Sequence, residues 1–240
     1  MTELTPESGR LEIKGGRALR KPWEGKPWES FADAAERGFA GQGFVVHAGA
    51  MSLYRRRWML FVDGENLAIR AQQFAAVNKA KLREGPHYYP DVFIWPPDRP
   101  SRQVFSSLAE LLQPDAIRAY YFTSAVGDEP GLLKIREGLW AMGFQPEVFK
   151  KDGKSVKSKG VDIALTTTML SHAALGNYEA AVLIAGDGDY LPLVTEVKRL
   201  GRFVCVAFFQ EPGLGLNPAL RLAADDFMDL TPTFMATLLF

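Results

Sequence analysis

The stretch "VLIAGDGDYLPLV", Val182 to Val194, contains the transition on which the predicted fold depends. Its first half has the length and apolar composition of a buried β-strand, and from Tyr190 onward its apolar residues follow helical spacing. Asp187 and Asp189 stand between the two halves, separated by one glycine. A buried strand that runs into a helix is typical of α/β folds, in which sites lie beyond the carboxyl ends of strands. The stretch therefore predicts two carboxylates at such an edge.

The same alternation of strands and helices extends along the chain from Trp58 onward. Three other long apolar runs are "WMLFVDG", "AIRAYYFTSA" and "RFVCVAFF", and "QPEVFKK" is a shorter run. Segments with apolar residues at helical spacing separate these runs. Strands that are apolar along their whole length are buried on both faces, which favours a parallel sheet covered by helices on each side. We therefore expect an open, doubly wound α/β fold.

The overall composition indicates an ordinary globular protein. The chain has 240 residues, 47% of them hydrophobic and 23% charged, so a sizeable core is available. Its 28 basic and 28 acidic residues leave no net charge, so only local clusters of charge can indicate a partner. Cys205 is the only cysteine, which excludes an intramolecular disulfide and a zinc cluster of thiolates. Because we find no signal-peptide pattern and no apolar run of membrane-spanning length, we expect a cytoplasmic protein.

The first fifty residues differ from the rest of the chain. Residues 1–50 are rich in glycine, proline and charge, and they repeat the motif "KPWE" at Lys21–Glu24 and Lys26–Glu29. Such a segment buries little apolar surface, so we expect a poorly ordered tail whose two KPWE tryptophans are available to a protein partner. Met51 opens a stretch that reads as a natural protein start, which makes it an alternative first residue. We assign residues 51–240 to one domain.

Four aspartates are expected to converge at the carboxyl edge of the sheet: Asp63, Asp162, Asp187 and Asp189. Asp63 ends the first long strand, Asp187 follows the third, and Asp162 lies in the first turn of a helix. Each of them alone has the simpler explanation of a helix cap or turn residue. Caps, however, do not require carboxylates at the ends of two buried strands. Like charges at close range favour a bound cation, and ligands that are all oxygen favour Mg²⁺ or Mn²⁺. We predict that these four residues bind the metal and are catalytic.

Candidate substrate-binding residues flank the four aspartates. A magnesium ion held by carboxylates neutralises phosphate charge and activates a water molecule, which suits phosphoryl chemistry. The lysine-rich stretch "KKDGKSVKSKG", Lys150–Gly160, leads directly into Asp162. We expect its lysines to contact a phosphate backbone, with a solvated loop as the alternative. Asn66 stands at a helix start, where capping and ligand contact are equally good explanations. The predicted substrate-binding residues are Asn66, Lys154, Lys157 and Lys159.

The remaining polar residues are expected to have structural or surface roles. Glu65 should be either exposed or a first-turn residue that interacts with the helix dipole. Arg55–Arg57 precede the first strand and should lie at the opposite end of the sheet. We assign no catalytic role to the scattered histidines. The phosphate-binding pattern G-x-x-x-x-G-K-[ST] is absent, and no G-x-G-x-x-G follows the first strand. The sequence therefore does not support a nucleotide cofactor.

Three blocks of the sequence resemble the NYN domain, the LabA-like group within the PIN-like nuclease superfamily. They are "MLFVDGENL", "KSKGVDIALTTTML" and "VLIAGDGDYLPLVTEVKRLGRFVCV", and "NPALRLAADDFMDL" resembles the closing segment of that group. The resemblance implies a Rossmann-like PIN fold, an acidic site for Mg²⁺ and, for several members, ribonuclease activity. By position, the residues that match the motifs of the family are Asp63, Asn66, Asp162, Asp187 and Asp189.

One position departs from that family pattern. The LabA-like pattern often has another aspartate six residues after the position of Asp162, where this chain has Thr168. Six residues correspond to about 240° of helical rotation, so the two positions do not face one metal directly. The departure therefore affects an outer or second-metal role. Two hypotheses follow: a metal-dependent endoribonuclease and, as the alternative, a non-catalytic RNA-binding or regulatory adaptor that retains the acidic pocket.

Overall fold

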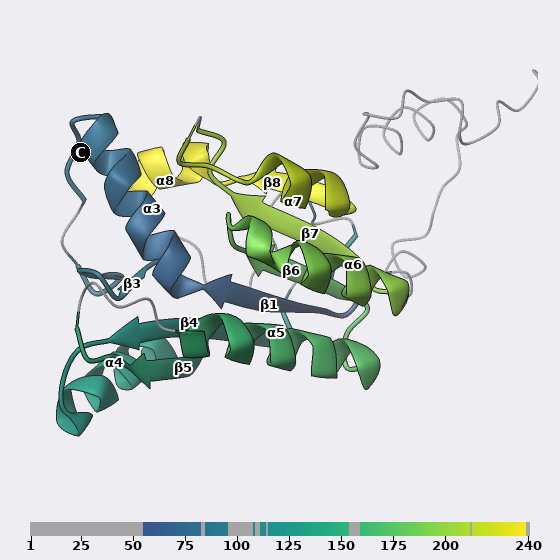
Figure 1. Cartoon of the computed structure of the whole chain (residues 1–240), viewed down its shortest axis with the longest axis horizontal. Helices are drawn as coiled ribbons and strands as arrows, with labels where there is room; N and C mark the ends of the chain where they lie inside the picture. Colours follow the sequence, from purple (N-terminus) through teal and green to yellow (C-terminus); the bar gives the residue numbers. More distant parts are fainter. Residues whose placement is uncertain are drawn as a thin grey trace, which may run out of the picture. The chain divides into compact units, whose positions relative to one another are not determined.

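The computed structural model describes residues 55–82, 85–95, 108, 111–113, 115–153, 159–211 and 213–238. Its main sheet has six strands in the order β5-β4-β1-β6-β7-β8, and every neighbouring pair is parallel (Figure 1). The strands are β1 (Trp58–Asp63), β4 (Arg118–Ala125), β5 (Gln145–Lys150), β6 (Ala180–Ile184), β7 (Phe203–Phe208) and β8 (Asp226–Asp229). The predicted parallel α/β sheet is confirmed, and the closing segment "DFMD" adds β8 as an outermost strand next to β7.

Helices cover both faces of this sheet. They are α3 (Gly64–Val77), α4 (Glu129–Ala141), α5 (Lys159–Ala174), α6 (Leu191–Arg199), α7 (Pro218–Ala223) and α8 (Thr231–Leu238), with a short 3₁₀ turn, η2 (Gly188–Tyr190), before α6. Buried side chains of α3, α4 and α8 share one hydrophobic core with the sheet. Those of α5, α6 and α7 share the other core. A small antiparallel hairpin, β2 (Tyr88–Tyr89) and β3 (Phe93–Ile94), packs with the first core.

The central strand β1 explains why these layers form. All six of its residues are buried, and successive side chains point to opposite faces. Trp58, Leu60 and Val62 enter the α3-side core, whereas Met59 and Phe61 enter the α5-side core. A strand of this kind is stable only when helices cover both faces of the sheet. This is the physical basis of the prediction made from its continuous apolar run.

The strand register brings the ends of β1 and β6 together. The two strands are direct neighbours, with Val62 opposite Ile184. Asp63 and the segment that begins at Ala185 therefore leave the sheet side by side at its carboxyl edge. The premise that the first and third long strands are neighbours is confirmed, so Asp63 and the turn that contains Asp187 and Asp189 follow adjacent strands.

Some predictions concern residues outside the described part of the chain. These include the tail of residues 1–50 with its "KPWE" motifs. Among the described helices, none is both long and apolar enough to cross a membrane.

Candidate functional site

Asp63 is the buried centre of the acidic edge. It is the last residue of β1 and the N-cap of α3, and its Oδ1 accepts a hydrogen bond of 3.0 Å from the backbone N–H of Asn66. Its other carboxylate oxygen, Oδ2, accepts a bond of 2.9 Å from the hydroxyl of Tyr190. Only 3% of the residue is exposed. Both oxygens of this carboxylate are thus held in place by the two segments that follow β1 and β6.

Tyr190 connects Asp63 to a second carboxylate. Its hydroxyl also lies 3.2 Å from Oδ1 of Asp162, which is in the first turn of α5. Because a tyrosine hydroxyl carries a single proton, the two carboxylates share one donor. Burial is the main cause of a raised pKa of Tyr190, and the charges of Asp63 and Asp162 act in the same direction, so the hydroxyl keeps its proton. The structure therefore brings together Asp63 and Asp162, two of the four predicted aspartates.

The environment of Asp63 disfavours its negative charge. Burial is the main reason that the pKa of Asp63 is raised to about 7. The negative charges of Asp162 and Glu65 also raise this pKa, whereas the hydrogen bonds from Asn66 and Tyr190 lower it. A carboxyl group in this position is only partly ionised at neutral pH. A bound cation would favour its ionised form.

The other two aspartates lie in the adjacent turn after β6. Asp187 is the N-cap of η2, and its Oδ1 accepts a hydrogen bond of 3.2 Å from the backbone N–H of Asp189. The helix α6 begins at Leu191, and its N-cap residue Tyr190 makes no side-chain capping bond. The prediction that Asp189 caps a helix starting at Tyr190 is therefore wrong. The intervening 3₁₀ turn makes Asp187 the cap and places Tyr190 in the buried layer.

Within the described residues, no group of three or more histidine, cysteine, aspartate or glutamate side chains is arranged as a metal site. The acidic edge instead consists of the linked pair Asp63 and Asp162, with Asp187 and Asp189 at the end of the neighbouring strand. Ligation of a metal by all four thus stays a prediction.

Asn66 joins the ends of β1 and β6. Its side-chain Oδ1 accepts a hydrogen bond of 3.0 Å from the backbone N–H of Gly186. Asn217, the N-cap of α7, contacts the same glycine, because its backbone N–H donates to the carbonyl of Gly186 at 3.0 Å. A Cβ atom on Gly188 would lie 2.6 Å from Nδ2 of Asn217, so a larger residue there would displace this side chain. Asn66 therefore has a structural role, and its contact with substrate stays a prediction.

Glu65 lies in the first turn of α3, as one of its two predicted roles requires, but it is not exposed. Its side chain is buried rather than exposed, and its Oε1 lies 3.1 Å from Nζ of Lys151, which is also buried. Lys151 follows directly on β5, so the end of the edge strand is tied to the first turn of α3. The expectation of an exposed Glu65 was wrong because it used only the local helical position. The partner is 86 residues away in the sequence.

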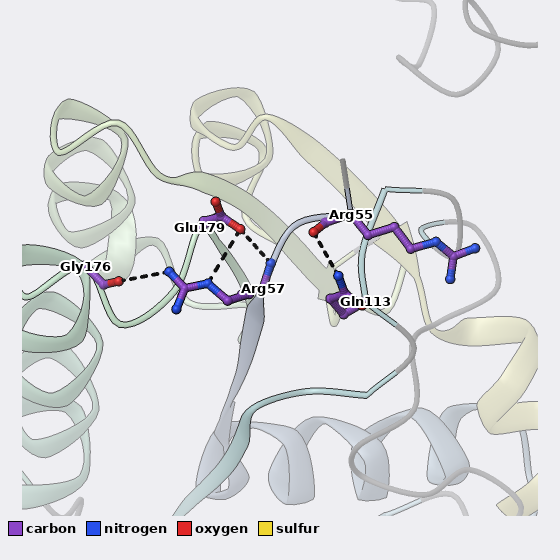
Figure 2. A network of polar contacts seen from close by, with 5 residues as sticks. All are labelled: Arg55, Arg57, Gln113, Gly176 and Glu179. Atoms are coloured by element: carbon purple, nitrogen blue, oxygen red, sulfur yellow. Dashed lines mark hydrogen bonds and ion pairs between the residues drawn. The ribbon is translucent and has the colours of Figure 1, made fainter. Parts of the chain in front are cut away.

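The side chains of the three predicted substrate-binding lysines lie outside the part of the chain that the structure describes. Lys154 and Lys157 are outside the described residues, and so is the side chain of Lys159, the first residue of α5. The arginines before β1 lie, as predicted, at the opposite edge of the sheet. Figure 2 shows the hydrogen bonds and ion pair that Arg57 makes there with Glu179 and with the carbonyl of Gly176.

Two residues of the site were missed by sequence reasoning, Tyr190 and Asn217. The signal for Tyr190 was its position directly after the two aspartates in an otherwise apolar helix start, where a buried hydroxyl requires a polar partner. Asn217 precedes Pro218 and caps α7 through hydrogen bonds from two backbone N–H groups. An asparagine before a proline predicts a helix cap, but it does not predict that the side chain of Asn217 lies against Gly188.

Comparisons with known proteins found one family and one solved structure that resemble this chain. The family model of the NYN domain matches residues 57–231. A solved structure of a protein of unknown function from Vibrio parahaemolyticus is similar, with 19% sequence identity and a TM-score of 0.49. That match covers 78% of this chain and 98% of the other. No curated protein matches this chain.

Proposed function

The chain belongs to the NYN domain family, which has a nuclease-type fold of the PIN-like superfamily, and we propose on that premise that it is a metal-dependent ribonuclease. The observation that carries the proposal is the linked pair of Asp63 and Asp162 at the carboxyl edge. Sites of open α/β sheets lie at this edge. Two carboxyl groups that approach the same hydroxyl are candidates for holding one cation.

The residues at this edge fit a hard divalent cation by their chemistry. All candidate ligands are carboxylate oxygens, which suit Mg²⁺ or Mn²⁺. Asp63 and Asp162 are the first candidates, and Asp187 and Asp189 follow from the neighbouring strand end. The raised pKa of Asp63 supports the same assignment, because a cation offsets the cost of its buried charge. When bound, such a cation neutralises charge on a phosphodiester and favours ionisation of a water molecule.

The protein's own residues would orient the reactants. Asp63 is held through both oxygens, by Asn66 and Tyr190, so its position is fixed before substrate arrives. A carboxylate held in this way orients an attacking water by accepting its hydrogen bond. Lysines 154, 157 and 159 are our candidates for contact with the phosphate backbone, because they directly precede Asp162 in the chain.

The test is an assay of RNA cleavage by the full-length protein. Single-stranded and structured RNA are incubated with Mg²⁺, with Mn²⁺ or with EDTA, and products are separated by gel electrophoresis. We expect cleavage that requires the metal, and we expect Asp162→Asn and Asp187→Asn to lower its rate by at least about a hundredfold. Glu137→Gln, which removes a carboxylate on the exposed face of α4, is the matched control and should cleave as the wild type does.

Three results would argue against this function. Cleavage that persists in EDTA would exclude the metal, and cleavage that is unchanged in both aspartate variants would place the active site elsewhere. RNA binding without cleavage under any divalent metal would support the alternative, an adaptor that retains the acidic pocket. Circular dichroism of each variant separates a loss of chemistry from a loss of fold.

A further inference from the structure

A cleft lined by both aromatic and polar side chains lies near the acidic edge, at the carboxyl end of β7. It has a volume of about 320 Å³, and its lining residues are Phe209, Gln210, Glu211, Leu216, Arg221 and Phe227. Small-molecule sites have volumes of about 300–1,000 Å³, so this cleft has room for one nucleotide and not for a helix. None of the assigned metal or substrate residues lines it.

Two consecutive residues, Leu216 and Asn217, connect the cleft to the acidic edge. Leu216 lines the cleft, and the next residue, Asn217, donates its backbone N–H to Gly186 and packs its side chain against Gly188. Gly186 and Gly188 flank Asp187. A chain of nucleotides bound across the acidic edge would therefore reach the cleft within a short distance.

The wall of the cleft is held by backbone hydrogen bonds. Leu216 N–H donates to the carbonyl of Phe209 at 3.0 Å, and Gly215 N–H donates to the carbonyl of Glu211 at 2.7 Å. The backbone N–H of Gln210 donates to the hydroxyl of Thr231 at 3.0 Å. The cleft is thus formed in advance, and a ligand would not have to order it.

The chemistry of the lining suits an unpaired base. The guanidinium carbon of Arg221 lies 4.6 Å from the ring centroid of Phe227, so the cation stacks on an aromatic ring. Arg221 is exposed on α7, which leaves its other side open to a ligand. Guanidinium planes and aromatic rings are the surfaces on which proteins stack unpaired RNA bases. Gln210 and Glu211 add hydrogen-bonding groups for the edge of a base.

We infer that this cleft is a subsite for one unpaired nucleobase of an RNA strand that crosses the acidic edge. The inference rests on the proposed function, because it takes RNA to be the ligand. It goes beyond that function in selecting single-stranded RNA and in assigning the selection to the stacked pair Arg221 and Phe227. A base within a duplex is already stacked and cannot enter the cleft.

The test measures binding of a short fluorescein-labelled single-stranded RNA to the full-length protein by fluorescence anisotropy, in EDTA and at fixed salt. An abasic oligonucleotide with the same phosphates is the second probe. Arg221→Lys keeps the charge but removes the planar group, and Arg221→Ala removes both. Arg199→Ala removes an exposed arginine on α6 and is the matched control.

We expect both Arg221 variants to weaken binding of the RNA by roughly tenfold, and Arg199→Ala to leave it unchanged. The abasic probe should be bound with the same low affinity by three proteins: the wild type, Arg221→Lys and Arg199→Ala. The inference is overturned if Arg221→Lys binds RNA as tightly as the wild type does, because the cleft would then only attract phosphate. It is also overturned if the wild type binds the RNA and abasic probes equally well.

Failure of the subsite is distinguishable from failure of the proposed function. If Arg221 is required for RNA binding but no metal supports cleavage, the subsite stands and the ribonuclease assignment falls. If the protein cleaves RNA and the Arg221 variants bind it normally, the assignment stands and the subsite falls.

Discussion

At the amino-end edge of the sheet a positive charge lies beside a negative one, whereas at the carboxyl-end edge two aspartate carboxyl groups share a neutral hydroxyl. Arg57 lies 3.9 Å from Glu179, and both side chains are about half exposed (Figure 2). Asp63 and Asp162 instead share the hydroxyl of Tyr190, and Asp63 is buried. The first arrangement has little energetic cost. In the second, burial disfavours the charge of Asp63 and raises its pKa.

This contrast indicates which edge is functional. Charges that serve the fold are found next to opposite charges or backbone carbonyls, as Arg57 is. A buried carboxyl group with a strongly raised pKa, such as that of Asp63, is costly to ionise, and such groups concentrate at functional sites. Four variants test the contrast, from the largest expected effect to the smallest.

The largest effect concerns the dependence of stability on pH. The pKa of Asp63 is raised from 3.8 to about 7, so the folded state holds a proton that the unfolded state loses. The contribution of this group to stability is therefore complete below pH 3.8 and is lost as pH rises to about 7. Asp63→Asn keeps the helix cap but does not titrate. Relative to the wild type, the variant should gain about 4 kcal/mol over that range.

Urea unfolding of both proteins at a series of pH values, without divalent metal, measures this difference. The comparison of the two proteins removes the effect of every other titrating group. Curves of stability against pH that run parallel would show that Asp63 is not destabilised by its surroundings, and the contrast between the edges would be lost.

The second effect concerns the buried ion pair beside the acidic edge. Lys151→Met leaves the carboxylate of Glu65 buried without its cation, next to Asp63. We expect a loss of about 3 kcal/mol in the free energy of unfolding, measured in urea at neutral pH. Adding Glu65→Gln to this variant should recover part of the loss, because the unpaired charge is then removed. If the free energy of unfolding falls by no more than for an exposed ion pair, the carboxylate of Glu65 does not depend on Lys151 as a buried charge would.

The third effect concerns the shared hydroxyl. Tyr190→Phe keeps the buried ring and removes the donor that Asp63 and Asp162 share. We expect the variant to be less stable by about 1–2 kcal/mol without metal. The loss should shrink in saturating Mn²⁺, since a cation between the carboxylates replaces the hydroxyl. Thermal unfolding with and without Mn²⁺ measures both losses of stability. An equal loss in the two conditions would show that the cation does not bind at the carboxyl groups that Tyr190 contacts.

The smallest effect is expected at the amino-end edge. Glu179→Gln removes the charge that faces Arg57 but keeps an oxygen for the backbone N–H of Arg57, which donates to it at 2.8 Å. Because the pair is exposed, the free energy of unfolding should change by at most about 0.5 kcal/mol. Urea unfolding checks this value. A loss as large as that of Lys151→Met would mean that the two edges do not differ.

The sheet and its acidic edge were predictable because they depend on short patterns. Continuous apolar runs such as that of β1 require burial on both faces, and an aspartate directly after such a run must lie at a strand end. The adjacency of β1 and β6 was only assumed, yet it follows a common arrangement of parallel sheets. The structure confirms it.

The finer contacts of the site were not predictable, because they join distant segments. Tyr190 reaches Asp63 only because a 3₁₀ turn precedes α6, and helical periodicity does not indicate that turn. Glu65 is buried because β5 ends beside α3, which no local pattern records. The mistaken assignment of the cap to Asp189 has the same origin as the omission of Tyr190.

The central claim is that the carboxyl edge holds a divalent cation, and Mn²⁺ binding tests it most directly. Electron paramagnetic resonance measures free Mn²⁺ in titrations of the wild type, Asp63→Asn and Glu179→Gln. We predict that the wild type and Glu179→Gln bind Mn²⁺ equally well and that Asp63→Asn raises the Kd by roughly a hundredfold. Equal affinity of Asp63→Asn and the wild type would show that the cation is not held at this edge.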